Sequence, residues 1–201
     1  MSRFDGILMI RFILIISFLL FVVMPSSAQR FKGHLVAGFN LAQIDGDRLA
    51  GYHKIGANVG LGVATVLSER WQISTSFAFS QLGTLRTRND DPASIYDKIT
   101  LNTVEVPVMV HLLDWKFHFK AGLVYNRLID YNVIDVLGED ITDLNAFQQN
   151  NVAAMLGFTY FWNEHWGFDF RWAKAITDLE SNPDNSNLLS KWISFKTMYV
   201  F

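Results

Sequence analysis

Charged and histidine side chains that are capable of acid–base chemistry recur at alternate positions in the second half of the chain. They are Glu105, His111, Lys116, His118, Lys120, Asp169, Arg171 and Lys196. A histidine beside a carboxylate can act as a general base, so one interpretation is a catalytic or ion-conducting cluster. No serine-centred or metal-spaced motif accompanies the two histidines. We therefore favour a structural network of paired charges, and we expect no catalytic residue, no metal, no cofactor and no enzyme activity.

The segments that carry these side chains alternate apolar and polar residues with a period of two, which is typical of β-strands. In the last segment, Ile193, Phe195 and Tyr199 lie on one face, and Ser194 and Lys196 lie on the other. The same rhythm predicts strands at residues 31–41, 54–66, 71–80, 100–112, 115–126, 151–160, 167–173 and 192–201. No heptad pattern or linker interrupts this rhythm, so we expect one all-β domain.

The connections between the predicted strands fall into two classes that alternate along the chain. Three are short turns, at residues 67–70, 113–114 and 163–164. Four are longer polar loops, at residues 45–53, 83–98, 128–149 and 178–191. Short turns on one side and long loops on the other are typical of antiparallel outer-membrane barrels.

The apolar faces together hold about forty side chains, many of them aromatic, and these exceed what the interior of an eight-stranded barrel accommodates. They are therefore expected to face lipid, while the opposite faces, rich in Gly, Ser, Asn and Ala, fill a narrow, plugged, polar lumen. A last strand ending on Phe201 suits a barrel in which this strand pairs with the first. The prediction is an eight-stranded antiparallel transmembrane β-barrel in the cell outer membrane, with both termini in the periplasm.

The N-terminal residues have the order of a secretory signal peptide. Arg3 and Arg11 precede the apolar residues 12–24, and Pro25 and small residues follow up to Ala28. We expect residues 1–28 to be a cleaved signal peptide and residues 29–201 to be the barrel domain; an uncleaved anchor is the alternative, although a spanning helix needs about 20 apolar residues. The formal net charge of −2 gives no reason to expect a nucleic-acid partner.

Inside the predicted barrel, the strand faces place five charged side chains in one polar network: Glu105, Lys120, Asp169, Arg171 and Lys196. Pairing across the turn at residues 113–114 predicts that Glu105 lies within diagonal reach of Lys120. His111 and His118 are expected near the periplasmic rim.

Aromatic residues gather beside the predicted short turns. Trp71, Trp115, Trp162, Trp166 and Phe201 all fall at this level and predict an aromatic girdle on one side of the membrane. Tyr199 and Phe201 are predicted to form the assembly signal, because Lys196 occupies a position where glycine is preferred.

The long loops carry charges that suggest two further ligands. The third loop contains Asp130, Asp135, Glu139, Asp140 and Asp143 without an intervening Lys or Arg. Carboxylates at this density can hold Ca²⁺, but the spacing matches no calcium loop, and a solvated acidic surface is favoured. In the second loop, Arg86 and Arg88 can meet lipopolysaccharide phosphates, although two acidic residues follow them.

Several motifs resemble the PorT-like outer-membrane barrels of Bacteroidetes. They are Asn-Leu-Ala-Gln-Ile-Asp-Gly-Asp at 40–47, Leu-Ala-Gly-Tyr-His-Lys at 49–54, Leu-Ser-Glu-Arg-Trp at 67–71, Val-Glu-Val-Pro at 104–107, and Arg-Trp-Ala-Lys-Ala-Ile-Thr-Asp at 171–178. Ala175 departs from the glycine expected there. The resemblance implies a barrel of the cell envelope, and its founding member implies an association with type IX protein secretion.

The sequence thus predicts a structural or accessory envelope barrel. Its expected partners are outer-membrane lipid, the barrel-assembly machinery during insertion and, from the resemblance, components of type IX secretion. A surface ligand-binding barrel that acts through its long loops and a small-solute pore are the main alternatives. A pore needs a wider lumen than eight strands usually leave. An envelope enzyme remains a further alternative that depends on His118.

Overall fold

The computed structural model describes residues 31–88, 90–180 and 188–201. The signal peptide predicted at residues 1–28 lies outside the described residues. Among the described residues, no helix is both long enough and apolar enough to cross a membrane.

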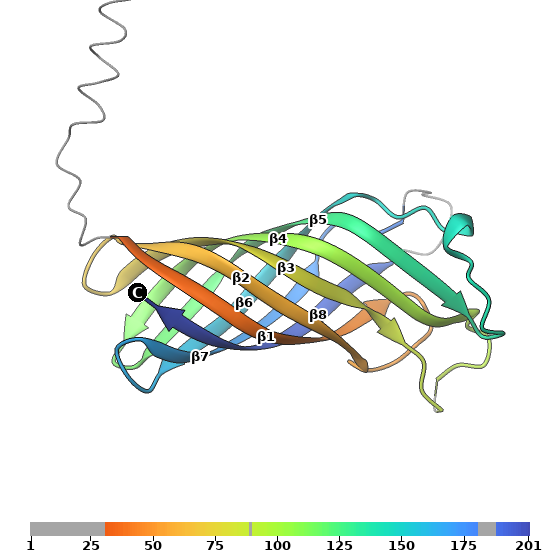
Figure 1. Ribbon diagram of the computed structural model, residues 1–201, viewed down its shortest axis with the longest axis horizontal. Coiled ribbons are helices and arrows are strands. Elements are labelled where there is room, and N and C mark those ends of the chain that lie inside the picture. The colour runs from red at the N-terminus through yellow and green to blue at the C-terminus, as the bar shows by residue number, and fades with distance from the viewer. Residues whose placement is uncertain (1–30, 89, 181–187) are drawn as a thin grey trace, which may run out of the picture. The chain divides into compact units, whose positions relative to one another are not determined.

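Eight strands and one short 3-10 helix make up the described chain. They are β1 (Phe31–Asp45), β2 (Lys54–Val66), β3 (Trp71–Leu85), β4 (Tyr96–Asp114), β5 (Phe117–Asp135), η2 (Thr142–Leu144), β6 (Asn150–Phe161), β7 (Trp166–Ala175) and β8 (Leu189–Val200). Each strand pairs antiparallel with the next, and β8 pairs with β1, so the sheet is a closed barrel (Figure 1). The predicted fold class is confirmed.

The first and last strands close the barrel along the whole length of β8. Their pairing runs from His34 opposite Val200 to Asp45 opposite Leu189. The backbone N–H of Phe201 donates to the carbonyl of Gly33 over 2.9 Å and extends the closure by one more bond. The closed sheet therefore leaves no strand with an unpaired edge, as a lipid environment requires.

The short turns lie at one end of the barrel together with the C-terminus, and the long loops lie at the other (Figure 1). We call these the short-turn end and the long-loop end. Toward the long-loop end, β3, β4 and β5 extend into segments expected to be loops. β4 begins at Tyr96, and β5 continues to Asp135. These extensions hold because their inward side chains, such as Ile99 and Val133, are fully buried and apolar.

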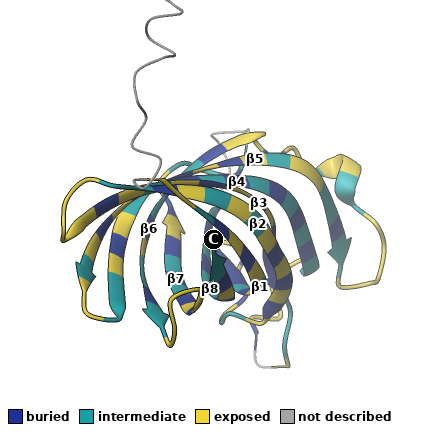
Figure 2. Cartoon of the chain, turned by 60° about the vertical axis from the view of Figure 1, so that its left-hand side comes forward, coloured by how far each residue is buried: buried dark blue, intermediate teal, exposed yellow. Residues whose placement is uncertain are grey.

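Exposed and buried residues alternate along the strands (Figure 2). The exposed set is apolar: Ile55 is 66% exposed, Phe77 is 60% exposed and Leu123 is 55% exposed. The opposite set is buried and includes many polar residues. The prediction that the apolar face points outward is therefore confirmed, and the strands are long enough to span a hydrocarbon core, which takes about 9–11 residues.

The interior is not polar along its whole length, in contrast to the polar lumen that the sequence predicts. Toward the long-loop end it holds an apolar core of inward-facing side chains, among them Ile44, Leu82, Leu101, Met155 and Trp192. Polar and charged side chains occupy the middle of the barrel, and a cavity opens at the short-turn end. The interior therefore consists of an apolar core, a polar layer and a cavity.

Candidate functional site

The polar layer contains a buried cluster centred on Asp169 of β7. One carboxylate oxygen accepts a hydrogen bond from Arg171 Nε over 2.7 Å. The other oxygen accepts from Lys120 Nζ and from the hydroxyl of Thr159, the latter over 2.9 Å. Lys120 also donates to Thr159 over 2.8 Å. One carboxylate thus balances two buried cations.

A second part of the polar layer joins Glu105 of β4 to side chains of β1, β2 and β8. Asn58 Nδ2 donates to Glu105 Oε2 over 2.7 Å, and Lys196 Nζ donates to Asn58 Oδ1 over 3.3 Å. Asn40 extends this part, because its amide donates to Ser80 over 2.8 Å while its oxygen accepts from Ser194 over 2.7 Å. Lys196 therefore contacts Glu105 through Asn58.

The predicted diagonal contact between Glu105 and Lys120 is wrong. In the observed register, Glu105 lies opposite Asn126, and Lys120 lies opposite His111. Six residues separate the two positions along β4, which is about 20 Å at the rise of a strand. Lys120 instead reaches across β6 to Asp169, which the stagger of the barrel brings close.

The side chains of the polar layer are almost completely buried. Asn40, Asn58 and Ser194 have no exposed area, and Glu105 and Lys196 are only 1% and 2% exposed. An aqueous path through the barrel would leave the side chains along it accessible to water. The side chains therefore fill the barrel completely at this level, as expected for eight strands.

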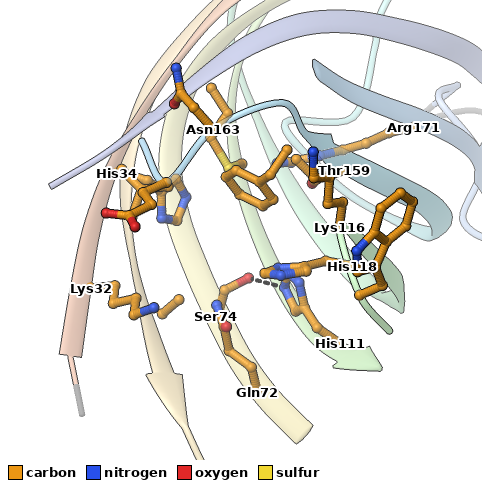
Figure 3. A pocket seen from close by; sticks show the side chains of 16 residues that line it. Lys32, His34, Gln72, Ser74, His111, Lys116, His118, Thr159, Asn163 and Arg171 are labelled. Atoms are coloured by element: carbon orange, nitrogen blue, oxygen red, sulfur yellow. Dashed lines mark hydrogen bonds between the residues drawn. The ribbon is translucent and has the colours of Figure 1, made fainter. Parts of the chain in front are cut away.

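Below the polar layer, the short-turn end contains a cavity of about 370 Å³ (Figure 3). Lys32, Asn163 and Glu164 lie at its mouth, and Arg171 lies at its inner end together with Thr159. Because both of these last two residues belong to the Asp169 cluster, the polar layer forms the floor of the cavity.

Three histidines from three strands line this cavity: His34 of β1, His111 of β4 and His118 of β5. His111 Nε2 lies 2.6 Å from the hydroxyl oxygen of Ser74, as the dashed line in Figure 3 marks. His118 packs against Phe161 with ring centroids 4.7 Å apart. The structure places His111 and His118 at the short-turn end of the barrel, and the orientation of this end toward the periplasm stays a prediction.

The pair formed by Ser74 and His111 resembles the first half of a hydrolytic site. In such sites a third group orients the histidine through its other nitrogen. Nδ1 of His111 is buried and has no hydrogen-bond partner among the described residues. The pair alone therefore provides an oriented hydrogen bond rather than an activated nucleophile.

Sequence reasoning did not select Lys32, His34, Gln72 or Ser74, all of which line the cavity. The sequence pattern could have identified them. Each lies at an inward-facing position of β1 or β3, near the strand end at the short turns. No spacing motif marks them, because they come from β1 and β3 and meet only through the pairing of both strands with β2 and the curvature of the sheet.

The structure places the five predicted girdle residues at the short-turn end. Trp71, Trp162 and Trp166 are between 43% and 48% exposed, Phe201 is 69% exposed and Trp115 is 81% exposed. Trp115 occupies the β4–β5 turn with a positive φ of 53°.

The residues of the predicted assembly signal contact one another beside the barrel closure. The rings of Tyr199 and Phe201 lie edge to face with centroids 5.3 Å apart, and Trp166 lies 4.9 Å from Tyr199. These aromatic rings therefore form one contiguous surface at the end of β8.

The long loops are tied to one another at the opposite end. Asp90 accepts from the backbone N–H of Ala50 over 2.9 Å, and Ser94 donates to the carbonyl of Asp47 over 2.7 Å. Farther round the rim, the N–H of Gln148 donates to the carbonyl of Leu179 over 2.6 Å. The loops therefore close over the apolar core.

Burial and hydrogen bonding shift the pKa values of two carboxyl groups in these loops. Asp47 is 2% exposed, and this desolvation raises the pKa of its carboxyl to about 6 although Oδ1 accepts from the N–H of Leu49. The pKa of Asp90 is lowered instead, because the N–H groups of Ala50 and Thr87 donate to its carboxylate. Two neighbouring carboxylates thus have opposite shifts.

The acidic third loop does not gather its carboxylates. Asp135 Oδ1 accepts from the N–H groups of Leu137 and Glu139, and Asp140 Oδ1 accepts from Thr142. The carboxylates of Asp135 and Asp140 therefore each stabilise a turn of their own loop segment. Within the described ranges, no three His, Asp or Glu side chains group closely enough to hold a metal ion.

Arg86 of the second loop is occupied within its own loop. Its guanidinium donates to the carbonyls of Tyr96, Ser94 and Asp91 over 3.0, 2.5 and 3.3 Å. These bonds fix the arginine against the loop backbone, which leaves little of its hydrogen-bonding capacity for lipopolysaccharide.

Comparisons with solved structures find similar chains at low sequence identity. Ail, the attachment invasion locus protein of Yersinia pestis, is 10% identical, with a TM-score of 0.50 over 86% of this chain and 99% of that chain. Neisserial surface protein A is 14% identical, with a TM-score of 0.48 over 85% and 97%. CarO of Acinetobacter baumannii is 10% identical, with a TM-score of 0.40 over 83% and 95%.

No curated protein sequence matches the chain. Its residues 14–201 match the family described as outer membrane protein beta-barrel domain, which covers every described strand. The closed barrel, its apolar exterior and this match agree with one another. The chain therefore belongs to the outer membrane protein beta-barrel domain family, and its location is the outer membrane.

Proposed function

We propose that the protein is a non-conducting barrel with a structural or accessory role in the cell envelope. The packed polar layer supports this proposal, because side chains such as Asn40 and Ser194 have no exposed area and leave no open path at this level of the barrel. The apolar core and the loops tied together above it add a second barrier. The alternative function of a small-solute pore would require all three to move aside.

Conductance in a planar lipid bilayer tests the proposal. Purified, folded protein is expected to give no single-channel steps under a voltage at which a large porin, added to the same membrane, conducts. A barrel that is shown to have inserted, yet stays silent, supports the closed lumen. Reproducible steps from the folded wild type would contradict it and favour the pore.

The association with type IX secretion rests on the sequence resemblance alone and is part of this proposal as an accessory role. Its test compares secreted and surface proteins between the native host and a strain that lacks this chain, with envelope integrity checked first. Accumulation of type IX cargo in the periplasm would support the accessory role. Unchanged secretion would remove it and leave a structural role.

Surface ligand binding through the long loops is the second candidate, and one observation favours it. The loop between β5 and β6 presents Leu137 and Leu144 at 80% and 83% exposure, far from the lipid-facing belt of the strands. Replacing both residues with serine should abolish retention of a ligand on intact cells if this loop binds it. Retention of the ligand by the double variant would exclude this loop as the binding site.

A further inference from the structure

The side chains that line the cavity at the short-turn end carry more positive than negative charge. Lys32, Lys116 and Arg171 line it, whereas Glu164 at the mouth is the only carboxylate among the described residues that line it. Lys116 Nζ lies 5.3 Å above the ring of Trp115, so its ammonium is held near the opening. The cavity is therefore suited to an anion.

Arg171 offers a fixed donor at the floor of this cavity. Its Nε donates to Asp169, and this bond sets the direction of the guanidinium. Among the described residues, no further hydrogen bond from Arg171 is formed, so its two terminal nitrogens are available. Asp169 also neutralises Lys120, which leaves the cluster of three with a net positive charge. A planar guanidinium of this kind binds oxyanions through two parallel bonds.

The imidazole rings add neutral donors around the same space. In the tautomer in which the hydroxyl of Ser74 donates to His111 Nε2, the proton of His111 is on Nδ1. That nitrogen has no partner among the described residues, but it is buried and has almost no surface that a molecule in the cavity could contact, so His111 is not counted among the donors to the ligand. His34 and His118 line the cavity on other strands, and each neutral ring also carries one N–H donor. Donors from several directions suit a tetrahedral oxyanion better than a planar carboxylate.

The remaining wall of the cavity is apolar. Phe161, Met198 and Val200 contribute to it, and the volume of about 370 Å³ falls in the range of small-molecule sites. A bare phosphate ion would leave most of this space empty. An organic body attached to the anion would contact the apolar wall.

We propose that this cavity binds the phosphoryl group of a small phosphate monoester, with the oxyanion against Arg171 and the organic body against Phe161 and Met198. The closed polar layer prevents the ligand from passing farther, so it enters and leaves at the short-turn end. This binding site goes beyond the envelope role proposed above, and its test is independent of conductance and secretion.

Isothermal titration of the detergent-purified protein tests the site with three probes: phenyl phosphate, inorganic phosphate and benzoate. Phenyl phosphate is expected to bind saturably with one site per chain. Inorganic phosphate, which lacks the apolar body, and benzoate, which lacks the tetrahedral group, should each bind about tenfold more weakly, a difference of about 1.4 kcal/mol.

Variants locate the site. The double variant Lys32→Gln, Lys116→Gln, at exposed and half-buried positions, should weaken phenyl phosphate about tenfold without disturbing the buried clusters. Arg171→Lys keeps the charge but removes the planar donor, and should weaken binding as much. The matched control Lys98→Gln removes a positive charge at the long-loop end and should bind as the wild type does.

Three results would overturn the proposal. They are the absence of saturable binding of phenyl phosphate to folded wild type, equal binding by the Lys32, Lys116 double variant, and equal affinity for benzoate. Inorganic phosphate that binds as tightly as phenyl phosphate would overturn the part that concerns the organic body. Heat-dependent gel migration of each variant confirms that the barrel is folded before titration.

Discussion

Asp169 holds two buried cations with one carboxylate, and it is the residue whose loss the interior tolerates least. Asp169→Asn leaves Lys120 and Arg171 buried without a counter-charge. Breaking one partner of a buried ion pair costs about 3–5 kcal/mol. We expect the free energy of unfolding in urea, measured in detergent, to fall by about that amount.

The control for this variant is Asp45→Asn at the long-loop end. Asp45 also pairs with two lysines, Lys174 and Lys191, but its side chain is 32% exposed. A partly exposed ion pair of this kind contributes about 1 kcal/mol or less. Equal losses of unfolding free energy in the two variants would show that burial does not increase the contribution of the Asp169 ion pairs to stability.

Glu105 provides a second test of the polar layer. Glu105→Ala removes one of the acceptors of Asn58 and the carboxylate that Lys196 contacts through Asn58, and both Asn58 and Lys196 are buried. We expect a lower temperature for the loss of the folded band in heat-dependent gel migration. Glu105→Gln, which keeps an acceptor for Asn58, separates the lost hydrogen bond from the lost charge. An unchanged unfolding temperature for Glu105→Ala would contradict the prediction.

Trp115 combines an unfavourable backbone with a highly exposed side chain. A bulky residue at a φ of 53° is strained by about 1–2 kcal/mol, whereas asparagine tolerates this region. We therefore expect Trp115→Asn to match or exceed the wild type in stability in detergent and to be less stable in lipid vesicles, where the anchor is lost. Denaturation midpoints in both media measure this.

Trp71 is the matched residue for that comparison. It is 48% exposed at the same end, and its backbone φ is not positive. Trp71→Asn should lose stability in vesicles without any gain in detergent. If Trp115→Asn behaved identically to it in both media, the backbone of the turn would carry no strain.

The alternation of the strands predicts which side chains face the interior of the barrel, but it does not predict which residues they form ion pairs with. Parity places Glu105, Lys120 and Asp169 inside correctly, because a one-residue shift would turn a whole apolar face inward. The pairing of Lys120 with Asp169 instead depends on the stagger between strands and on the reach of a long side chain across β6. The cavity histidines are hidden for the same reason, since His34 and His111 come from strands that are not neighbours.

At the scale of elements, the loop between β1 and β2 is bonded to the next loop through the carboxylate of Asp90, whereas the carboxylate of Asp47 bonds within its own loop, and the two carboxylates have opposite pH behaviour. The pKa of Asp47 is about 6 in the fold, above the 3.8 of an exposed carboxyl. Folding therefore favours its protonated form, and this stabilisation is present at low pH and is lost as the pH rises from about 4 to 6. Asp47→Asn should stabilise the loop at pH 7.5 by about 1–2 kcal/mol and have little effect at pH 4.

Asp90→Asn is the opposite case. The lowered pKa of Asp90 means that its carboxylate stabilises the fold above the pKa of the unfolded chain, and this stabilisation is lost as the pH falls through the lowered value. The variant should weaken the loop at pH 7.5. Rates of protease cleavage in the loops, measured at both pH values, distinguish the two variants. The same direction of change for both would contradict these assignments.

The lengths of the strands were underestimated where polar residues face outward. Toward the long-loop end, β4 presents Lys98 and Asn102 on its outward face among apolar neighbours, so the segment reads as a loop. Pairing with β5 and burial of Ile99 and Leu101 extend the strand nonetheless. Tertiary pairing therefore overrides the local composition.

For the whole molecule, we expect the short-turn end to face the periplasm and the long-loop end to face the exterior. Because the chain has no cysteine, single substitutions report orientation directly. A membrane-impermeant thiol reagent should label Leu137→Cys on intact cells, whereas Glu164→Cys should react only after the outer membrane is permeabilised. The reverse pattern would place the cavity outside the cell.

The polar layer also separates the two ends of the molecule with respect to sequence change. Phe147, Leu179 and Leu188 of the long loops belong to the apolar core, but substitutions and insertions at exposed loop positions lie outside it, and we expect them to leave the cavity and the closed lumen unchanged. The two ends can therefore diverge at different rates within a lineage. An engineer can graft a foreign epitope into the loop beside Gly138, where a side chain would meet nothing within 4 Å, and still keep a sealed barrel, provided that Gly138 itself is kept because its φ of 84° favours glycine.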